Sequence, residues 1–135
     1  MNAFNETADE ALQAIRQRAE ELNMKGVAIV AASQGDRVQS WLSKMLVVGI
    51  MKKGPTQDEP EMNLIAIAYS KAAEMADTLK ASGGRTPPLK GEFGWRGGVI
   101  ARGKAGYLFA AFSGGSSADD VKAANAGLAV LKAAL

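Results

Sequence analysis

The sequence predicts an α/β fold of the α+β kind, in which helices cover an antiparallel β-sheet and the elements follow the order α-ββ-α-ββ-α. Apolar residues recur at helical spacing in three segments, and the stretches between them hold paired strand-like runs with turn signals. Hairpins separated by helices indicate an antiparallel sheet rather than a parallel Rossmann sheet. With 135 residues, the chain is expected to form one domain, residues 1–135, around one hydrophobic core.

The first predicted helix begins near Thr7, because Thr7 and Glu10 have the spacing of a capping box. Apolar residues then recur on one face, and Asn23 and Gly26 are typical of a helix end. Residues 26–43 follow with an apolar run, a Gly-Asp turn and an alternating segment, a pattern that predicts a β-hairpin.

Residues 44–54 either extend the second strand of this hairpin through a bend near Gly49 or begin another strand, and the sequence leaves both open. A polar loop bounded by prolines then leads to a second helix over about residues 61–81. The apolar stripe of this helix is rich in alanine, which lets a helix lie close to a sheet or to another helix.

Residues 82–98 contain six glycines and two prolines, a composition that predicts a long irregular loop. A second hairpin is expected over residues 97–115, with its turn at Gly103-Lys104. The last predicted helix begins within the sequence SGGSSADD, residues 113–120, and buries a face of leucine, valine and alanine.

Two absent residue types exclude several kinds of chemistry. The chain contains no cysteine, which excludes disulfides, thiolate nucleophiles and cysteine-ligated metals. It contains no histidine, so Ser-His and Cys-His catalysis, histidine-ligated zinc and histidine-ligated haem are excluded as well. No metal site is therefore predicted, and any catalysis would use Asp, Glu, Lys, Tyr, Ser or Arg.

Charge and hydropathy limit the expected partners and location. The net charge is only +2, and no run of Lys or Arg is long enough to indicate nucleic-acid binding. No apolar stretch approaches the length of a membrane span, and the first residues lack the pattern of a secretory signal. We therefore expect a cytoplasmic protein whose partners include neither nucleic acid nor a membrane.

The glycine turn in residues 113–120 has two interpretations. A glycine-rich turn that leads into a helix N-terminus is a common phosphate-binding arrangement. Ser116 or Ser117 can instead cap the helix, and Asp119 and Asp120 in its first turn complement the helix dipole. Because two negative charges repel a phosphate and the lysine of a P-loop is missing, the sequence favours a capped helix.

Candidate binding residues lie in the glycine-rich loop and on the second helix. Phe93, Trp95 and Arg96 can line a pocket, because aromatic rings stack on flat ligands and arginine pairs with carboxylates. In the alternative interpretation, the aromatic rings anchor the loop and Arg96 is solvated. Lys71 lies at the polar edge of an apolar helix, where a lysine is expected to keep its charge in solvent. A buried Lys71 that acts as a base is the alternative.

Three segments resemble the GlcG/HbpS-like proteins, which are related to the C-terminal domain of PduO-type proteins. GVAIVAASQGDRVQSWL resembles the opening hairpin of that family, and IAIAYSKAAEMA resembles its central helix, with Lys71-Ala72 as the typical Lys-Ala pair. GGVIARGKAGYLFAAFSGGSSADDVKAANAGLAVL resembles the C-terminal signature, with Ser-Gly-Gly at residues 113–115 and Ala-Gly-Leu at residues 126–128. The resemblance covers about residues 8–134.

The resemblance implies a profilin-like domain, with an antiparallel sheet flanked by helices, that assembles into homo-oligomers. Some members of the family bind haem or related tetrapyrroles. This chain departs from the family where residues 33–36 read SQGD in place of an Asp followed by paired glycines, and where KKGPTQDEPE precedes the central helix. Without histidine, an axial haem ligand would come from another side chain, and the sequence does not select among Met51, Tyr69, Tyr107 and Lys71.

These observations lead to one expected function and two alternatives. We expect a non-catalytic, homo-oligomeric small-molecule-binding or accessory protein that binds a tetrapyrrole or a small carboxylate. The expected binding residues are Lys71, Phe93, Trp95 and Arg96. The first alternative is a lyase- or isomerase-type enzyme that acts on a small acid with Lys71 as its acid–base catalyst. The second is a purely structural, oligomer-forming protein with a closed apolar interior.

Overall fold

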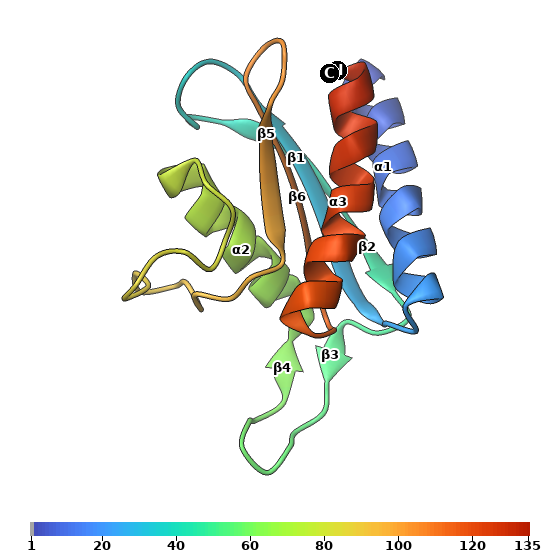
Figure 1. Ribbon diagram of the computed structural model, residues 1–135, viewed down its shortest axis with the longest axis vertical. Coiled ribbons are helices and arrows are strands. Elements are labelled where there is room, and N and C mark those ends of the chain that lie inside the picture. The colour runs from blue at the N-terminus through green and yellow to red at the C-terminus, as the bar shows by residue number, and fades with distance from the viewer. Residues whose placement is uncertain (1) are drawn as a thin grey trace.

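The computed structural model describes residues 2–135 and has helices on both faces of a four-stranded antiparallel sheet (Figure 1). The predicted α+β class and element order are confirmed, and a short two-stranded ribbon is added to them. The elements are α1 (Asn2–Glu21), β1 (Gly26–Ser33), β2 (Trp41–Val48), β3 (Lys52–Lys53), β4 (Met62–Asn63), α2 (Leu64–Thr78), β5 (Gly98–Arg102), β6 (Tyr107–Ser113) and α3 (Ser117–Ala134).

The strands of the main sheet lie in the order β2-β1-β6-β5, and each is antiparallel to its neighbour. Both predicted hairpins are confirmed, because β1 pairs with β2 and β5 pairs with β6 around a turn that includes Gly103-Lys104. The central strand β1 is buried along almost its whole length, since α1 and α3 cover one face of the sheet and α2 covers the other. The apolar core therefore forms two layers, one on each face of the sheet.

Small residues bring the helices close to their neighbours in both layers. On one face, α1 and α3 lie side by side (Figure 1), and a Cβ atom on Gly127 would lie only 2.5 Å from Ile15 Cδ1. On the other face, Ala68 and Ala72 of α2 are fully buried in one apolar cluster with Phe109 of β6. The alanine stripe of the second helix thus packs on the sheet, which is one of its two expected roles.

The start of the first helix differs from the prediction. α1 begins at Asn2 instead of near Thr7, so Thr7 lies inside the helix and does not cap it. Phe4 is buried four residues before Ala8, and it extends the apolar stripe by one more turn. Packing of this additional turn on the core outweighs the local capping signal.

The second helix is shorter than the expected 61–81. Its N-cap is Asn63, whose side-chain oxygen accepts hydrogen bonds from the backbone N–H groups of Ile65 and Ala66 at 3.0 and 3.1 Å. It ends at Leu79, which takes a left-handed conformation with φ of 56°.

The open question about residues 44–54 is answered by Gly49. β2 ends at Val48, Gly49 turns the chain with φ of +82°, and β3 begins a separate strand. The β3–β4 hairpin projects at the end of the molecule where α2 and α3 begin (Figure 1). This placement brings residues of the hairpin to the site described next.

Candidate functional site

A cavity of about 80 Å³ lies where the first turns of α2 and α3 meet the end of β6, the β3–β4 hairpin and the glycine-rich loop. Each of these segments contributes wall residues. The lining residues are Lys53, Met62, Leu64, Ile67, Lys71, Trp95, Arg96, Ser113, Gly114, Gly115, Ser117 and Asp120. The sequence SGGSSADD therefore forms one wall of the cavity.

A buried ion pair between Lys71 of α2 and Asp120 of α3 borders this cavity. Lys71 Nζ donates hydrogen bonds to Asp120 Oδ2 at 3.1 Å and to the backbone oxygen of Phe112 at 2.7 Å. The two side chains are only 2% and 5% exposed. Asp120 Oδ1 accepts a further hydrogen bond from the backbone N–H of Gly115 at 2.8 Å. The pair thus ties α2 to α3 across the end of β6.

The surroundings shift both members of the pair toward their neutral forms. Burial lowers the pKa of Lys71 from its ordinary value, although the nearby Asp120 carboxylate opposes the shift. Burial likewise raises the pKa of Asp120, while Lys71, the Gly115 N–H and Lys53 oppose the shift. Both shifts bring the neutral forms of the two side chains closer in free energy to their charged forms.

The wall of the cavity carries an excess of positive charge. Lys53, Lys71 and Arg96 face it, whereas Asp120 is the one carboxylate among the lining residues. Ser117 is the first residue of α3, so the positive end of that helix dipole also lies at the cavity. This distribution suits an anionic ligand.

Glu74 fixes the loop that carries Trp95 and Arg96. Glu74 is buried, and its Oε2 accepts hydrogen bonds from three successive backbone N–H groups, those of Gly83, Gly84 and Arg85, at 2.8, 3.2 and 3.4 Å. The start of the loop is thereby held against α2.

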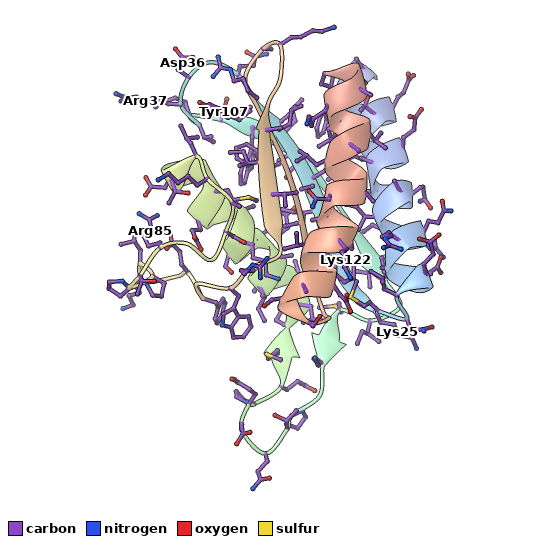
Figure 2. The ribbon with its side chains drawn as sticks, in the orientation of Figure 1. Lys25, Asp36, Arg37, Arg85, Tyr107 and Lys122 are labelled. Atoms are coloured by element: carbon purple, nitrogen blue, oxygen red, sulfur yellow. The ribbon has the colours of Figure 1, made fainter. Side chains whose placement is uncertain are left out.

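Ser82 and Arg85 anchor the same loop at further points. Ser82 Oγ donates to the backbone oxygen of Trp95 at 2.8 Å and accepts from the N–H of Gly98 at 2.9 Å. Arg85 Nη2 lies 2.7 Å from Asp77 Oδ2 and 2.9 Å from Glu92 Oε2, and Figure 2 shows Arg85 on this loop. These contacts hold an irregular segment in one shape, as the sequence predicts.

Three of the four expected binding residues line the cavity together, namely Lys71, Trp95 and Arg96. Phe93 does not line it: its ring lies beside that of Trp95, with 5.2 Å between the ring centroids, and it borders an adjoining groove. The expectation that Lys71 keeps its charge in solvent is wrong, because Lys71 is 3% exposed. Asp120 and the Phe112 carbonyl offset the loss of water around its ammonium group.

The prediction that Asp119 and Asp120 lie in the first turn of the last helix is confirmed. Ser116 caps α3, as one of the two expected serines, and Asp119 lies in the first turn as expected. Asp120 accepts a hydrogen bond from the Gly115 N–H at the start of this helix and also points inward to Lys71, a partner that the sequence did not predict. The sequence contained a signal for the inward direction of Asp120, because Asp120 shares helical spacing with Ala123 and Gly127, which are buried. The roles of Lys53, Glu74 and Ser82 were missed as well.

The cavity does not fit a tetrapyrrole. Its 80 Å³ is well below the roughly 300–1,000 Å³ typical of sites for larger organic ligands. Of the four considered axial ligands only Lys71 lines it, whereas Tyr107 lies under the Arg102 guanidinium and the Tyr69 hydroxyl lies 3.5 Å from Ser43 Oγ. Among residues 2–135, no group of three or more acidic side chains is arranged to hold a metal ion.

No protein-family model matches this chain, and no curated protein matches it either. The resemblance to the GlcG/HbpS-like proteins therefore rests on the three sequence segments that carry it. In the part of the chain that the structure describes, no helix combines the length and apolar character needed to cross a membrane.

Proposed function

We propose that this chain is a non-catalytic, homo-oligomeric protein of the GlcG/HbpS type that binds a small carboxylate in the cavity beside Lys71. The observation that carries the proposal is the buried Lys71–Asp120 pair in a cavity whose wall also holds Lys53 and Arg96. Three cationic side chains face one carboxylate there, and an anionic ligand neutralises the excess charge.

The chemical class of the ligand follows from Arg96 and the size of the cavity. A guanidinium group binds both oxygens of a carboxylate through parallel hydrogen bonds, which a lysine does not do. A volume of about 80 Å³ admits a short carboxylate or the carboxylate end of a longer molecule. Charge-assisted hydrogen bonds are stronger in such a partly enclosed site than in water.

Calorimetric titration with acetate at low ionic strength tests the proposal. We expect saturable binding that becomes about tenfold weaker in Arg96→Ala, as the loss of one charge-assisted pair predicts. Arg37→Ala is the matched control, since it removes the same charge from the loop after β1 at the opposite end of the molecule (Figure 2). Absence of binding, or equal affinities for wild type and Arg96→Ala, contradicts the proposal.

The tetrapyrrole form of the proposal makes a different prediction. If the protein binds haem through this site, titration with haemin produces a saturable Soret shift that decreases in Arg96→Ala. The small cavity favours the opposite result, a flat titration, while acetate still binds.

The homo-oligomeric part of the proposal is supported by β2, which forms an edge of the main sheet. Large apolar side chains along this edge and in the turn after it are 37–40% exposed, namely Leu42, Met45, Val47 and Ile50. An exposed apolar edge strand pairs readily with another chain. We expect native mass spectrometry to report more than one subunit, and Val47→Lys to release single chains. If the wild type has the mass of a single chain, the proposal that the protein is a homo-oligomer is contradicted.

An enzyme that uses Lys71 as acid–base catalyst is the second candidate. The observation in its favour is the geometry that such an enzyme needs: a buried lysine at a cavity, with the Asp120 carboxylate 3.1 Å away. Proton abstraction would exchange α-hydrogens of a bound acid with solvent. Deuterium incorporation into propionate in D₂O, present with wild type and lost in Lys71→Met, supports the enzyme; no incorporation supports the binding protein.

A further inference from the structure

A second hollow adjoins the cationic cavity. It is a groove of about 280 Å³ between the β3–β4 hairpin, α2 and the glycine-rich loop. Its lining residues are Glu59, Pro60, Glu61, Met62, Asn63, Ala66, Ile67, Phe93 and Trp95. Met62, Ile67 and Trp95 line both the groove and the cavity, so the two hollows adjoin each other.

The groove presents aromatic surface that the fold does not bury. Phe93 is 49% exposed and Trp95 is 38% exposed, with their ring planes inclined by 34°. The loop that holds them is anchored by Glu74, Ser82 and Arg85, so the backbone that carries the two rings is held in place. Exposed aromatic rings on an anchored loop beside an apolar wall are typical of a ligand site for a flat apolar group.

The two adjoining hollows carry opposite charge. Lys53, Lys71 and Arg96 lie at the cavity end. Glu59 and Glu61, both exposed, lie at the groove end on the segment before β4. A ligand with a carboxylate at one end only fits this distribution, whereas a second carboxylate at the far end meets the two glutamates.

We infer that the ligand is a monocarboxylate with a flat apolar tail, whose carboxylate occupies the cationic cavity and whose tail lies against Phe93 and Trp95. This inference rests on the proposed function and assigns its ligand class. It also gives Phe93 a role as a determinant of the ligand tail, outside the cavity itself.

Three probes test the inference by calorimetry: acetate, 3-phenylpropionate and 3-(4-carboxyphenyl)propionate. We expect 3-phenylpropionate to bind about tenfold or more tightly than acetate, because its ring buries apolar area against two aromatic side chains. The probe with a second carboxylate is expected to lose most of that advantage. Binding is also expected to quench the fluorescence of Trp95, measured in a Trp41→Phe background so that Trp95 is the remaining tryptophan.

The variant Phe93→Ala is expected to lower the affinity ratio of 3-phenylpropionate to acetate by about threefold or more. Leu89→Ala is the matched control, because Leu89 is an exposed apolar residue of the same loop that does not line the groove. It should leave the ratio unchanged.

The outcomes separate the inference from the proposed function. If acetate binds and the phenyl group adds no affinity, or Phe93→Ala does not change the ratio, the inference is overturned and the proposed function stands. If no probe binds, the proposed function is overturned, and the inference that rests on it is overturned with it. If Phe93→Ala dissociates an oligomer and the phenyl group adds nothing, the groove is an interface between copies of this chain, and the inference is overturned.

Discussion

Lys71 and Glu74 lie one turn apart on α2, and both are buried charged side chains, but the fold compensates their charges differently. Lys71 pairs with one opposite charge on another helix, and it does so at the wall of a cavity. Within residues 2–135, Glu74 has no cationic side chain among its hydrogen-bond partners; three backbone N–H groups of the glycine-rich loop surround its Oε2.

The difference suits two roles: the Lys71 charge agrees with the proposed ligand site, and the Glu74 charge holds the glycine-rich loop in place. A buried ion pair contributes little net stability compared with apolar side chains of similar size. The net stability from the Lys71–Asp120 pair does not by itself account for its burial, which agrees with the proposal that a ligand binds beside it. Glu74, in contrast, accepts hydrogen bonds from backbone N–H groups of a loop that has no regular secondary structure. We expect the shape of the loop to depend on these hydrogen bonds.

Breaking one half of the ion pair should have the largest effect. Asp120→Asn removes the partner charge of Lys71, and we expect it to lower the free energy of unfolding by about 3–5 kcal/mol. The double variant Lys71→Met/Asp120→Asn removes both charges and keeps an oxygen to accept the Gly115 N–H. It should recover most of that loss and fail to bind acetate. Urea unfolding measures the first effect and calorimetry the second; a double variant as unstable as the single one contradicts this account.

Removal of the Glu74 carboxylate should have the next largest effect. Glu74→Ala leaves three N–H groups without their acceptor, and we expect a loss of about 2 kcal/mol in unfolding free energy. Acetate binding should weaken as well, because Glu74 acts as a positioning residue for the loop that bears Arg96. Glu74→Gln keeps one acceptor oxygen and should be less damaging in both measurements. Unchanged acetate affinity in Glu74→Ala would mean that the position of the loop does not affect acetate binding.

The contact between Gly83 and Arg96 provides a sharper test of whether the shape of the loop controls acetate binding. A Cβ atom at Gly83 would lie 2.7 Å from Arg96 Cγ and 2.9 Å from its backbone nitrogen, and Gly83 has φ of +91°. Gly91 has a similar φ of +98° with nothing within 4 Å. Gly91→Ala should lose about 1 kcal/mol of stability from backbone strain, and Gly83→Ala should lose more, because its Cβ also overlaps Arg96. Weaker acetate binding is expected in Gly83→Ala alone. Equal acetate affinities of the two variants would contradict the expected dependence of binding on the loop position at Arg96.

The sequence predicted the fold far better than the site. Helical periodicity and turn residues such as Gly35 and Gly103 are local signals, and they were sufficient for the element order and both hairpins. The ion pair joins Lys71 to a residue 49 positions later, and no local pattern reports that the two meet. Thr7 shows the same limit in another form, because a correct capping spacing was overruled by the packing of Phe4.

The pH dependence of stability should show the smallest effect, and it tests whether the pair is costly to bury. Between 3.8 and the raised pKa of Asp120, the folded chain holds a proton that the unfolded chain releases, so stability decreases as pH rises through that interval. Between the lowered pKa of Lys71 and its ordinary value of 10.5, the unfolded chain holds the additional proton, and stability increases with pH.

Both slopes should disappear in Lys71→Met/Asp120→Asn, because this variant lacks both titrating groups. The other titrating groups contribute equally to the two proteins, so the difference in unfolding free energy between wild type and variant isolates the contribution of the pair. Urea unfolding at a series of pH values provides the measurement. Slopes of the opposite sign would mean that each charge stabilises the fold in its ionised form. In that case the pair would resemble Glu74 as a structural element, and the contrast between the two charges on α2 would no longer indicate a ligand.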